Sequence, residues 1–241
     1  MAETVVLLHG FAGTHRLWDG VIGRLGAQRY IARAPDLRGH GSAVARRPIT
    51  FAACADDVLA AAPGRFILCG YSLGGRVALH AALAAPERIT RLVLVATTAG
   101  IDDPAERAAR RAADLDLADR TAAGTIEDFV ARWSAQPLFA GDPPAIVPAW
   151  QRDMRRNDPQ ALAEVLRGIG TGAMEPLWDR LGELRMPAAV LAGVRDAKFV
   201  GLGERLAAGL AAGRLTVVPG AGHGVPREAP GAVAAAITAA G

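Results

Sequence analysis

Short apolar segments alternate with segments of helical periodicity along most of the 241-residue chain. The apolar segments are rich in Val, Leu and Ile and lack strict polar–apolar alternation, so we expect strands that are buried on both faces. They span residues 4–8, 30–34, 65–69, 91–96, 188–192 and 214–218. Helical patterns follow most of them, at residues 14–25, 51–61, 73–84, 198–211 and 226–240. This alternation predicts an α/β protein with an open, doubly wound, mostly parallel sheet joined by right-handed crossovers.

The alternation stops between the fourth and fifth predicted strands. Residues 99–184 contain helical patterns separated by Pro and Gly, with no strand pattern. We therefore expect an α/β core made of residues 1–98 and 185–241, with residues 99–184 inserted in it as a helical lid. A chain of this length suits one core with one such lid.

Charge is divided unevenly along a chain whose formal net charge is +3. Between Ile101 and Glu183, ten Arg stand against fifteen Asp and Glu, so this part carries −5 and the remainder +8. The positive excess forms no basic run with interleaved aromatic residues, which argues against nucleic-acid binding. Small anionic molecules, bound by local arginines, are the partners that this distribution favours.

The sequence also bears on location and cofactors. No apolar run approaches the ~20 residues of a membrane span, and the N-terminus lacks the basic region and cleavage site of a signal peptide. We therefore expect a cytoplasmic protein without a membrane span; monomer and homo-oligomer are both compatible with the sequence. Cys54 and Cys69 are interpreted as buried structural thiols. No metal-ligand spacing or nucleotide-binding loop is visible, so neither a metal nor a cofactor is expected.

A G-x-S-x-G motif stands where a predicted strand meets a predicted helix. It reads Gly70-Tyr71-Ser72-Leu73-Gly74-Gly75, the pattern of a nucleophile elbow. Its small residues permit a sharp turn that projects the Ser72 hydroxyl above the carboxyl edge of the sheet, beside helix amides that favour negative charge. Because a Ser hydroxyl reacts only when a neighbour accepts its proton, the motif requires partners.

The partners are expected in the chain order Ser, acid, His. Asp196 follows the fifth predicted strand and His223 the sixth, and both lie in loops at the carboxyl edge. Asp102 or Asp103, after the fourth strand, is the alternative acid. The sequence thus predicts a catalytic triad of Ser72, His223 and Asp196.

An oxyanion hole made of two backbone amides would complete the site. One amide is that of Leu73, and the other is that of Phe11 or Ala12 in the turn His9-Gly10-Phe11-Ala12-Gly13. His9 itself is interpreted as a structural residue of the turn.

Three further histidines are present. His15 and His40 lie near the same edge, where a turn-bracing or solvated role is favoured over contact with a ligand. His80 lies well inside a predicted helix and is interpreted as a packing residue.

Beyond the elbow, the chain resembles the 2-succinyl-6-hydroxy-2,4-cyclohexadiene-1-carboxylate synthases of menaquinone biosynthesis, lyases built on the α/β-hydrolase fold. The resemblance covers nearly the whole length. It is carried by residues 9–15 with Trp18, by residues 70–79, by Arg132-Trp133-Ser134-Ala135-Gln136-Pro137-Leu138-Phe139 and by residues 166–178. The elbow is shared by many hydrolases, whereas the two lid segments are specific, because lids diverge with the substrate.

The resemblance implies a reaction and a set of binding residues. Such synthases remove pyruvate from a cyclohexene that carries several carboxylates, with the triad Ser acting as a base on a ring C–H bond and no acyl-enzyme. A polycarboxylate requires fixed cations, and arginine binds carboxylates through two parallel hydrogen bonds. Arg76, one helical turn after Ser72, is the first candidate, with a helix brace as its alternative role. The other candidates are the lid arginines Arg107, Arg110, Arg111, Arg152 and Arg155.

Two aromatic residues, Tyr71 and Trp133, match positions that line the substrate in this family, with core packing as the alternative. A second function uses the same triad: hydrolysis of esters, lactones or activated C–C bonds through an acyl-Ser intermediate. A ligand-binding module on an inactive fold is disfavoured, because all three triad residues are present. The lid segments and Arg76 favour the lyase.

Overall fold

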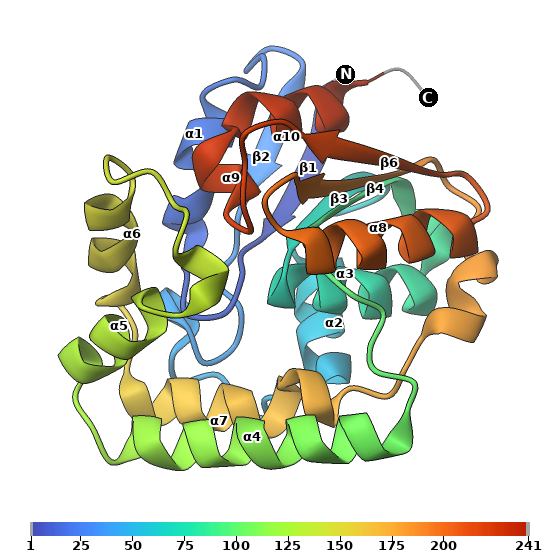
Figure 1. Ribbon diagram of the computed structural model, residues 1–241. Helices are drawn as coiled ribbons and strands as arrows, with labels where there is room; N and C mark the ends of the chain where they lie inside the picture. The colour runs from blue at the N-terminus through green and yellow to red at the C-terminus, as the bar shows by residue number, and fades with distance from the viewer. Residues whose placement is uncertain (1, 240–241) are drawn as a thin grey trace.

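The computed structural model describes residues 2–239 and contains one all-parallel sheet of six strands in the order β2-β1-β3-β4-β5-β6 (Figure 1). All six predicted strands are confirmed. Their bounds are β1 Glu3–Leu8, β2 Tyr30–Arg33, β3 Phe66–Tyr71, β4 Ile89–Val95, β5 Ala188–Gly193 and β6 Gly213–Val218. The strand order reverses between β1 and β3, and the last residue pair between these two strands is Leu8 with Gly70. The turn after β1 therefore lies beside the elbow after β3, at the point where such sheets place their sites.

Helices cover both faces of the sheet, so the doubly wound arrangement is confirmed. Helices α2 (Phe51–Ala60), α3 (Leu73–Ala84) and α8 (Ala197–Gly209) pack on one face, and α1 (Asp19–Ile22) and α10 (Pro230–Thr238) pack on the other (Figure 1). Successive strand residues enter opposite layers: Val6 and Leu8 of β1 join the first, Val5 and Leu7 the second. Burial on both faces explains why the strands read as continuous apolar runs.

Four α-helices lie between β4 and β5, within residues 99–184, which the sequence predicts as an insertion and which we call the insertion below. Its helices are α4 (Pro104–Ala122), α5 (Ile126–Ser134), α6 (Val147–Met154) and α7 (Pro159–Ile169). In Figure 1, α4 and α7 run side by side along the bottom of the molecule, and α5 and α6 lie at its left. The insertion has an apolar cluster of its own, built around Phe129 and Trp150, that also takes in Ala12 from the turn after β1. The insertion thus packs against the turn that follows β1. Its role as a lid stays a prediction.

Two predicted helices are shorter in the structure. Residues 14–25 form a 3-10 turn (His15–Trp18) followed by the single turn of α1, in a stretch that Gly20 and Gly23 make poorly helical. Residues 226–240 are divided into α9 (Val225–Glu228) and α10, and residue 240 lies outside the described residues. The break falls at Ala229, with φ −136° and ψ 58°, because a following proline disfavours the helical conformation.

Shorter features complete the fold. Further 3-10 turns span Gly41–Ala43, Pro86–Arg88, Pro137–Phe139, Thr171–Ala173 and Trp178–Glu183. Cys54 and Cys69 are buried free thiols, as predicted, and burial raises the pKa of Cys54 to about 11. None of the helices within residues 2–239 has both the length and the apolar character needed to cross a bilayer.

Candidate active site

The strained residue of the elbow is Ser72, which lies between the end of β3 and the start of α3. Its φ of 51° and ψ of −111° fall in a region that residues other than glycine rarely adopt. The flanking glycines make this turn possible. A Cβ on Gly70 would lie 2.3 Å from the carbonyl oxygen of Gly74, and one on Gly74 would lie 2.2 Å from that of Leu8. The motif therefore consists of residues that this tight strand–turn–helix packing demands.

The structure brings Ser72, His223 and Asp196 together. His223 Nε2 lies 3.4 Å from Ser72 Oγ, and His223 Nδ1 lies 2.7 Å from Asp196 Oδ2. Both His223 and Asp196 are buried. With Nδ1–H donating to the carboxylate, the Nε2 lone pair faces the hydroxyl, which is the tautomer that proton acceptance requires. The Ser–His contact is long for a hydrogen bond, as it often is in ligand-free sites.

The two alternative acids are engaged elsewhere. Asp102 is ion-paired with Arg205, and Asp103 caps helix α4 by accepting from the amides of Ala105 and Glu106. The geometry therefore favours Asp196 as the partner of the imidazole.

The choice between the two candidate oxyanion amides also follows from the geometry. The Ala12 N–H donates to His40 Nε2 at 3.2 Å, so it is already occupied. Phe11 and Leu73 both line the cavity in front of Ser72. The Phe11 amide is consequently the better candidate beside that of Leu73, the first residue of α3.

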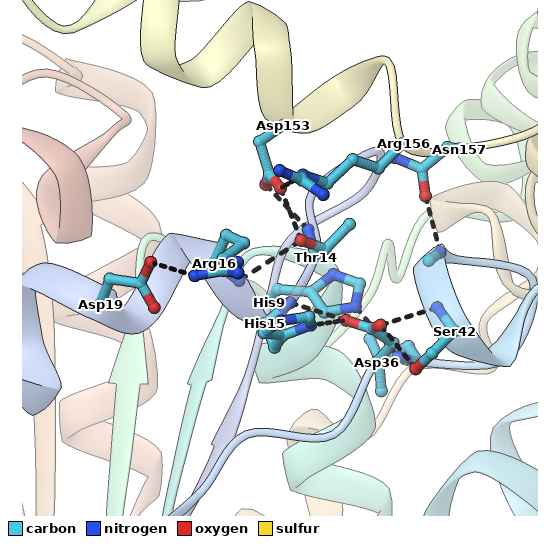
Figure 2. Close-up of polar contacts among 12 residues, drawn as sticks. His9, Thr14, His15, Arg16, Asp19, Asp36, Ser42, Asp153, Arg156 and Asn157 are labelled. Atoms are coloured by element: carbon cyan, nitrogen blue, oxygen red, sulfur yellow. Dashed lines mark hydrogen bonds and ion pairs between the residues drawn. The ribbon is translucent and has the colours of Figure 1, made fainter.

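Buried neutral histidines, of which Figure 2 shows His9, brace the loops around the turn after β1. His9 donates from Nδ1 to the Gly10 carbonyl at 2.8 Å and accepts the Leu37 N–H at Nε2, at 2.9 Å. Burial lowers the pKa of His9, and it lowers the pKa of His40 to about 3, so both rings are uncharged near neutral pH. The predicted structural role of His9 agrees with these contacts.

The remaining two histidines, His15 and His80, are not part of the candidate triad. His15 lies 3.0 Å from the Asp36 carboxylate through Nδ1. His80 stacks on Phe51 with ring centroids 4.3 Å apart, inside the helix layer. The packing role predicted for His80 matches this environment.

A cavity of about 730 Å³ opens in front of Ser72, between the core and the insertion. Tyr71 and Trp133 both line it, as the resemblance implies. The ring of Tyr71 lies 5.5 Å from that of His223, and Trp133 packs edge-on against Phe11 at 5.0 Å. Aromatic and apolar side chains of the insertion thus form the wall of the cavity that faces the nucleophile elbow. The further aromatic residues of the lining are Phe139, Trp150 and Phe199.

Five basic side chains line this cavity: Arg76, Arg110, Lys198, Arg205 and Arg227. Three of them are neutralised by acidic neighbours: Arg110 by Asp114, Arg205 by Asp102 and Arg227 by Asp142. Within residues 2–239, no carboxylate forms an ion pair with either of the other two.

Arg76 is the buried member of that pair. It is 7% exposed, and its Nη1 donates to the Ile169 carbonyl of the insertion at 2.8 Å. Burial, together with the nearby Arg110, lowers the pKa of Arg76 to about 9 against the opposing charge of Asp114, which forms its ion pair with Arg110; the guanidinium of Arg76 stays charged at neutral pH. Since a buried charge is costly without a counterion, this position favours an anionic ligand. Arg76 is at the same time a brace, between α3 and the insertion.

Of the other predicted arginines, Arg110 lines the cavity, whereas Arg107, Arg111, Arg152 and Arg155 lie outside its lining. Arg107 donates to the Ile101 carbonyl at 3.1 Å and Arg111 to the Arg167 carbonyl at 2.7 Å, while Arg152 and Arg155 are exposed. Sequence reasoning missed Lys198, Arg205 and Arg227. The available signal was proximity: Lys198 stands two residues after Asp196, and Arg227 four residues after His223. Among the residues described, no group of three or more His, Cys, Asp or Glu side chains is arranged to hold a metal ion.

The strand order, the nucleophile elbow at Ser72 and the contacts that link Ser72, His223 and Asp196 define the class of protein. It is an enzyme of the α/β-hydrolase fold. The sequence profile of the alpha/beta hydrolase family matches residues 5–236. A 2-succinyl-6-hydroxy-2,4-cyclohexadiene-1-carboxylate synthase from Salmonella agona (strain SL483) is 33% identical over 247 residues, covering 96% of this chain and 91% of its own. The chain belongs to this synthase (MenH) family of the α/β-hydrolase superfamily.

Solved structures are similar over the same range. The structure of MenH from S. aureus matches with a TM-score of 0.90 at 30% identity, covering 96% of this chain and 90% of that one. A thermophilic esterase from Thermogutta terrifontis, solved with malate bound, matches with a TM-score of 0.84 at 26% identity, covering 98% and 88%. Synthase and esterase thus share this fold, and the chemistry has to be argued from the site.

Proposed function

We propose that this enzyme acts in menaquinone biosynthesis as a lyase. It eliminates pyruvate from 2-succinyl-5-enolpyruvyl-6-hydroxy-3-cyclohexene-1-carboxylate to give 2-succinyl-6-hydroxy-2,4-cyclohexadiene-1-carboxylate. Beyond family membership, the observation that carries the proposal is Arg76, a buried guanidinium one turn from Ser72 with no carboxylate partner among residues 2–239. Such a charge suits a ligand that supplies carboxylates.

The names of substrate and product define the chemical change. A hydrogen leaves ring carbon 2, the enolpyruvyl oxygen leaves ring carbon 5, and one ring double bond becomes two conjugated ones. Carbon 2 carries the succinyl carbonyl, so loss of its proton places negative charge on that carbonyl oxygen as an enolate. Expulsion of pyruvate enolate from carbon 5 then completes the diene, and the departing enolate takes up a proton to become pyruvate.

Each part of the site has a role in this reaction. Ser72 takes the proton from carbon 2 while its own hydroxyl proton passes to His223, and Asp196 stabilises the resulting imidazolium. The amides of Phe11 and Leu73 donate to the enolate oxygen. The proton held on His223 is then available to the departing pyruvate enolate. No covalent bond to Ser72 is required.

Binding depends on the cations that face the cavity. The substrate carries three carboxylates, on the succinyl arm, the ring and the enolpyruvyl group. Arg76 and Lys198 are the two lining cations without an acidic partner among the described residues, so we assign them to carboxylate binding. The predicted contacts of Arg107, Arg152 and Arg155 with substrate stay predictions, since none of the three lines the cavity.

A serine hydrolase is the second candidate, and the similarity to the Thermogutta terrifontis esterase favours it. In that reaction Ser72 attacks a carbonyl, forms an acyl-enzyme and requires a water molecule for its hydrolysis. The same amides would stabilise the tetrahedral oxyanion. The two candidates differ in whether Ser72 is acylated.

The test is to supply enzymatically generated substrate and follow pyruvate release. We expect fast release by the wild-type enzyme and a loss to below a few per cent in Ser72→Ala, with circular dichroism and melting temperature unchanged. p-Nitrophenyl esters should give no burst of nitrophenol, and intact mass should show no acyl adduct. A burst with an adduct on Ser72, together with no pyruvate release, would establish the hydrolase instead.

A further inference from the structure

The turn that carries the Phe11 amide contains a strained residue. Ala12, next along the chain, is fully buried and has a φ of 60°, in the left-handed region that side chains other than glycine rarely adopt. Strained residues of this kind persist only where surrounding contacts hold them. The shape of the turn, and with it the direction of the Phe11 amide, therefore depends on those contacts.

Hydrogen bonds hold Ala12 on both sides. Its N–H donates to His40 Nε2 at 3.2 Å, and its carbonyl accepts from Asn157 Nδ2 at 2.9 Å. The two bonded groups belong to the two peptide units that flank the Ala12 Cα, so together they fix both of its backbone dihedral angles. His40 comes from the core, whereas Asn157 comes from the insertion, between α6 and α7.

Asn157 is built to act as a rigid link. It is buried, and its side chain makes two bonds besides the one to Ala12: Oδ1 accepts the Gly41 N–H at 3.0 Å, and Nδ2 donates to the Met154 carbonyl at 3.0 Å. Figure 2 shows Asn157 reaching from the insertion to the loop beside Ser42. One amide therefore connects the insertion to the loop that carries His40 and to the turn that carries Ala12.

Neighbouring contacts fasten the insertion to the same turn. The Asp153 carboxylate accepts from the Thr14 amide at 3.0 Å and from the Thr14 hydroxyl, as seen in Figure 2. The Phe11 ring packs against Phe129 and Trp133 of α5, with ring centroids 5.9 and 5.0 Å away. The side chain of Phe11 is thus already placed by the insertion, and Asn157 adds control of the backbone.

We infer that Asn157 is a positioning residue of the oxyanion hole. Its bond to the Ala12 carbonyl keeps residues 9–13 in the conformation that presents the Phe11 amide to the substrate oxygen. Docking of the insertion and completion of the oxyanion hole are consequently one event. The inference rests on the proposed function only in the identity of the oxyanion, since an esterase would use the same amide.

The decisive variant is Asn157→Asp, which retains the shape and the acceptor for Gly41 but removes the Nδ2 donor to the Ala12 and Met154 carbonyls. Gln160→Ala is the matched control, because it removes a side-chain donor to the Ala122 carbonyl within the insertion and leaves the turn untouched. Hydrogen–deuterium exchange of the peptide covering residues 9–17 reports on the turn, and kcat and KM for pyruvate release report on its use.

We expect exchange in this peptide to rise about tenfold or more in Asn157→Asp, since a lost bond lowers the free energy of local opening. Turnover should fall about 10- to 100-fold in kcat with KM changed less than about threefold, below the loss expected for deleting an oxyanion donor outright. The Gln160→Ala enzyme should match the wild type in both measurements. Unchanged exchange, or faster exchange with normal kcat, would overturn the inference.

A second variant keeps the test independent of overall folding. Ala12→Gly removes the steric cost of the left-handed φ, so the turn depends less on Asn157. In this background the additional loss of kcat caused by Asn157→Asp should be several-fold smaller than in the wild type, whereas an equal loss in both backgrounds would contradict the inference. A wild-type enzyme that releases no pyruvate would overturn the proposed function alone, since exchange together with kcat for p-nitrophenyl ester hydrolysis would still decide the role of Asn157.

Discussion

At the scale of single residues, Arg76 has two candidate roles, binding a substrate carboxylate and bracing the insertion, and the two can be tested separately. Its guanidinium donates to the Ile169 carbonyl and also faces the cavity with no carboxylate partner among the described residues. Burial lowers the pKa of Arg76 to about 9. A lysine has a lower ordinary pKa than an arginine, so the same burial would bring the pKa of a lysine at this position close to neutral pH. A lysine here would lose both the two-point grip on a carboxylate and part of its charge.

We therefore expect Arg76→Lys to lower kcat/KM for pyruvate release by about 10- to 150-fold, equivalent to ~1.5–3 kcal/mol of a charge-assisted bond. The loss should deepen as the pH is raised from 6 to 9, because the lysine deprotonates first. Steady-state kinetics against pH checks this, with Arg120→Lys on the exposed face of α4 as the control. Normal kinetics with a lowered melting temperature would identify Arg76 as a brace only.

At the scale of elements, two arginines of the core hold one loop of the insertion. Arg227 of α9 pairs with Asp142 at 2.7 Å, with side chains only 9% and 2% exposed, and its guanidinium lies over the Trp150 ring at 4.3 Å. Arg195, the residue before Asp196, donates to the Gly141 carbonyl. Residues 141–142 are thus held between the loop that contains Asp196 and helix α9, which follows His223.

Breaking this buried pair should destabilise the protein strongly, because it leaves a charge buried without its counterion. We expect Asp142→Asn to lower the unfolding free energy by ~2–4 kcal/mol, or the melting temperature by about 5–12 °C for a domain of this size. Calorimetry measures both.

The control for that prediction removes the whole pair. Asp142→Leu combined with Arg227→Met retains apolar contacts with Trp150 and contains no buried charge, so it should be more stable than Asp142→Asn. A double variant that melts below the single one would show that the stabilisation comes from packing of the arginine rather than from its charge.

At the scale of the whole molecule, two buried histidines and the half-buried His80 tie stability to pH. Burial lowers the pKa values of His9, of His40 to about 3, and of His80 to about 4, with Arg76 and Arg180 adding to the effect at His80. Each folded pKa lies below the ordinary value of 6.5, so the unfolded chain binds protons first as the pH falls. Their contribution is therefore complete above about pH 6.5 and is lost progressively as the pH falls toward the folded values.

His80 permits a direct test, since it is not one of the three candidate triad residues. In His80→Leu, the difference in unfolding free energy between pH 7.5 and pH 5 should shrink by up to ~2 kcal/mol, because one proton no longer binds to the unfolded state. Urea titrations at the two pH values measure this difference. Leu83→Ala, on the same helix, is the control and should lower the unfolding free energy by a similar amount at pH 7.5 and at pH 5. An unchanged pH difference in His80→Leu would refute the burial argument.

Prediction from sequence succeeded where the pattern is local. The six strands, the elbow and the order Ser72, Asp196, His223 are read from apolar runs and from the loops that follow them, and the structure brings the three side chains together. Helix extent is less predictable: the pattern is continuous over residues 14–25 and 226–240, but α1 already ends before Gly23, and the Ala229–Pro230 step divides the second stretch. Apolar periodicity reports which face is buried and is insensitive to such breaks.

By itself, then, the sequence determined the fold class, the identity of the candidate triad and the family, because each is encoded in neighbouring residues or in their order. Only the tertiary structure decided which oxyanion amide is available and which cations face the cavity. The Ala12 amide is taken by a histidine 28 positions away, and Arg227 meets an acid 85 positions away, whereas the predicted Arg107, Arg152 and Arg155 lie outside the cavity lining. Such pairings depend on ångström-scale placement of segments distant in the chain, and local periodicity carries no information about that placement.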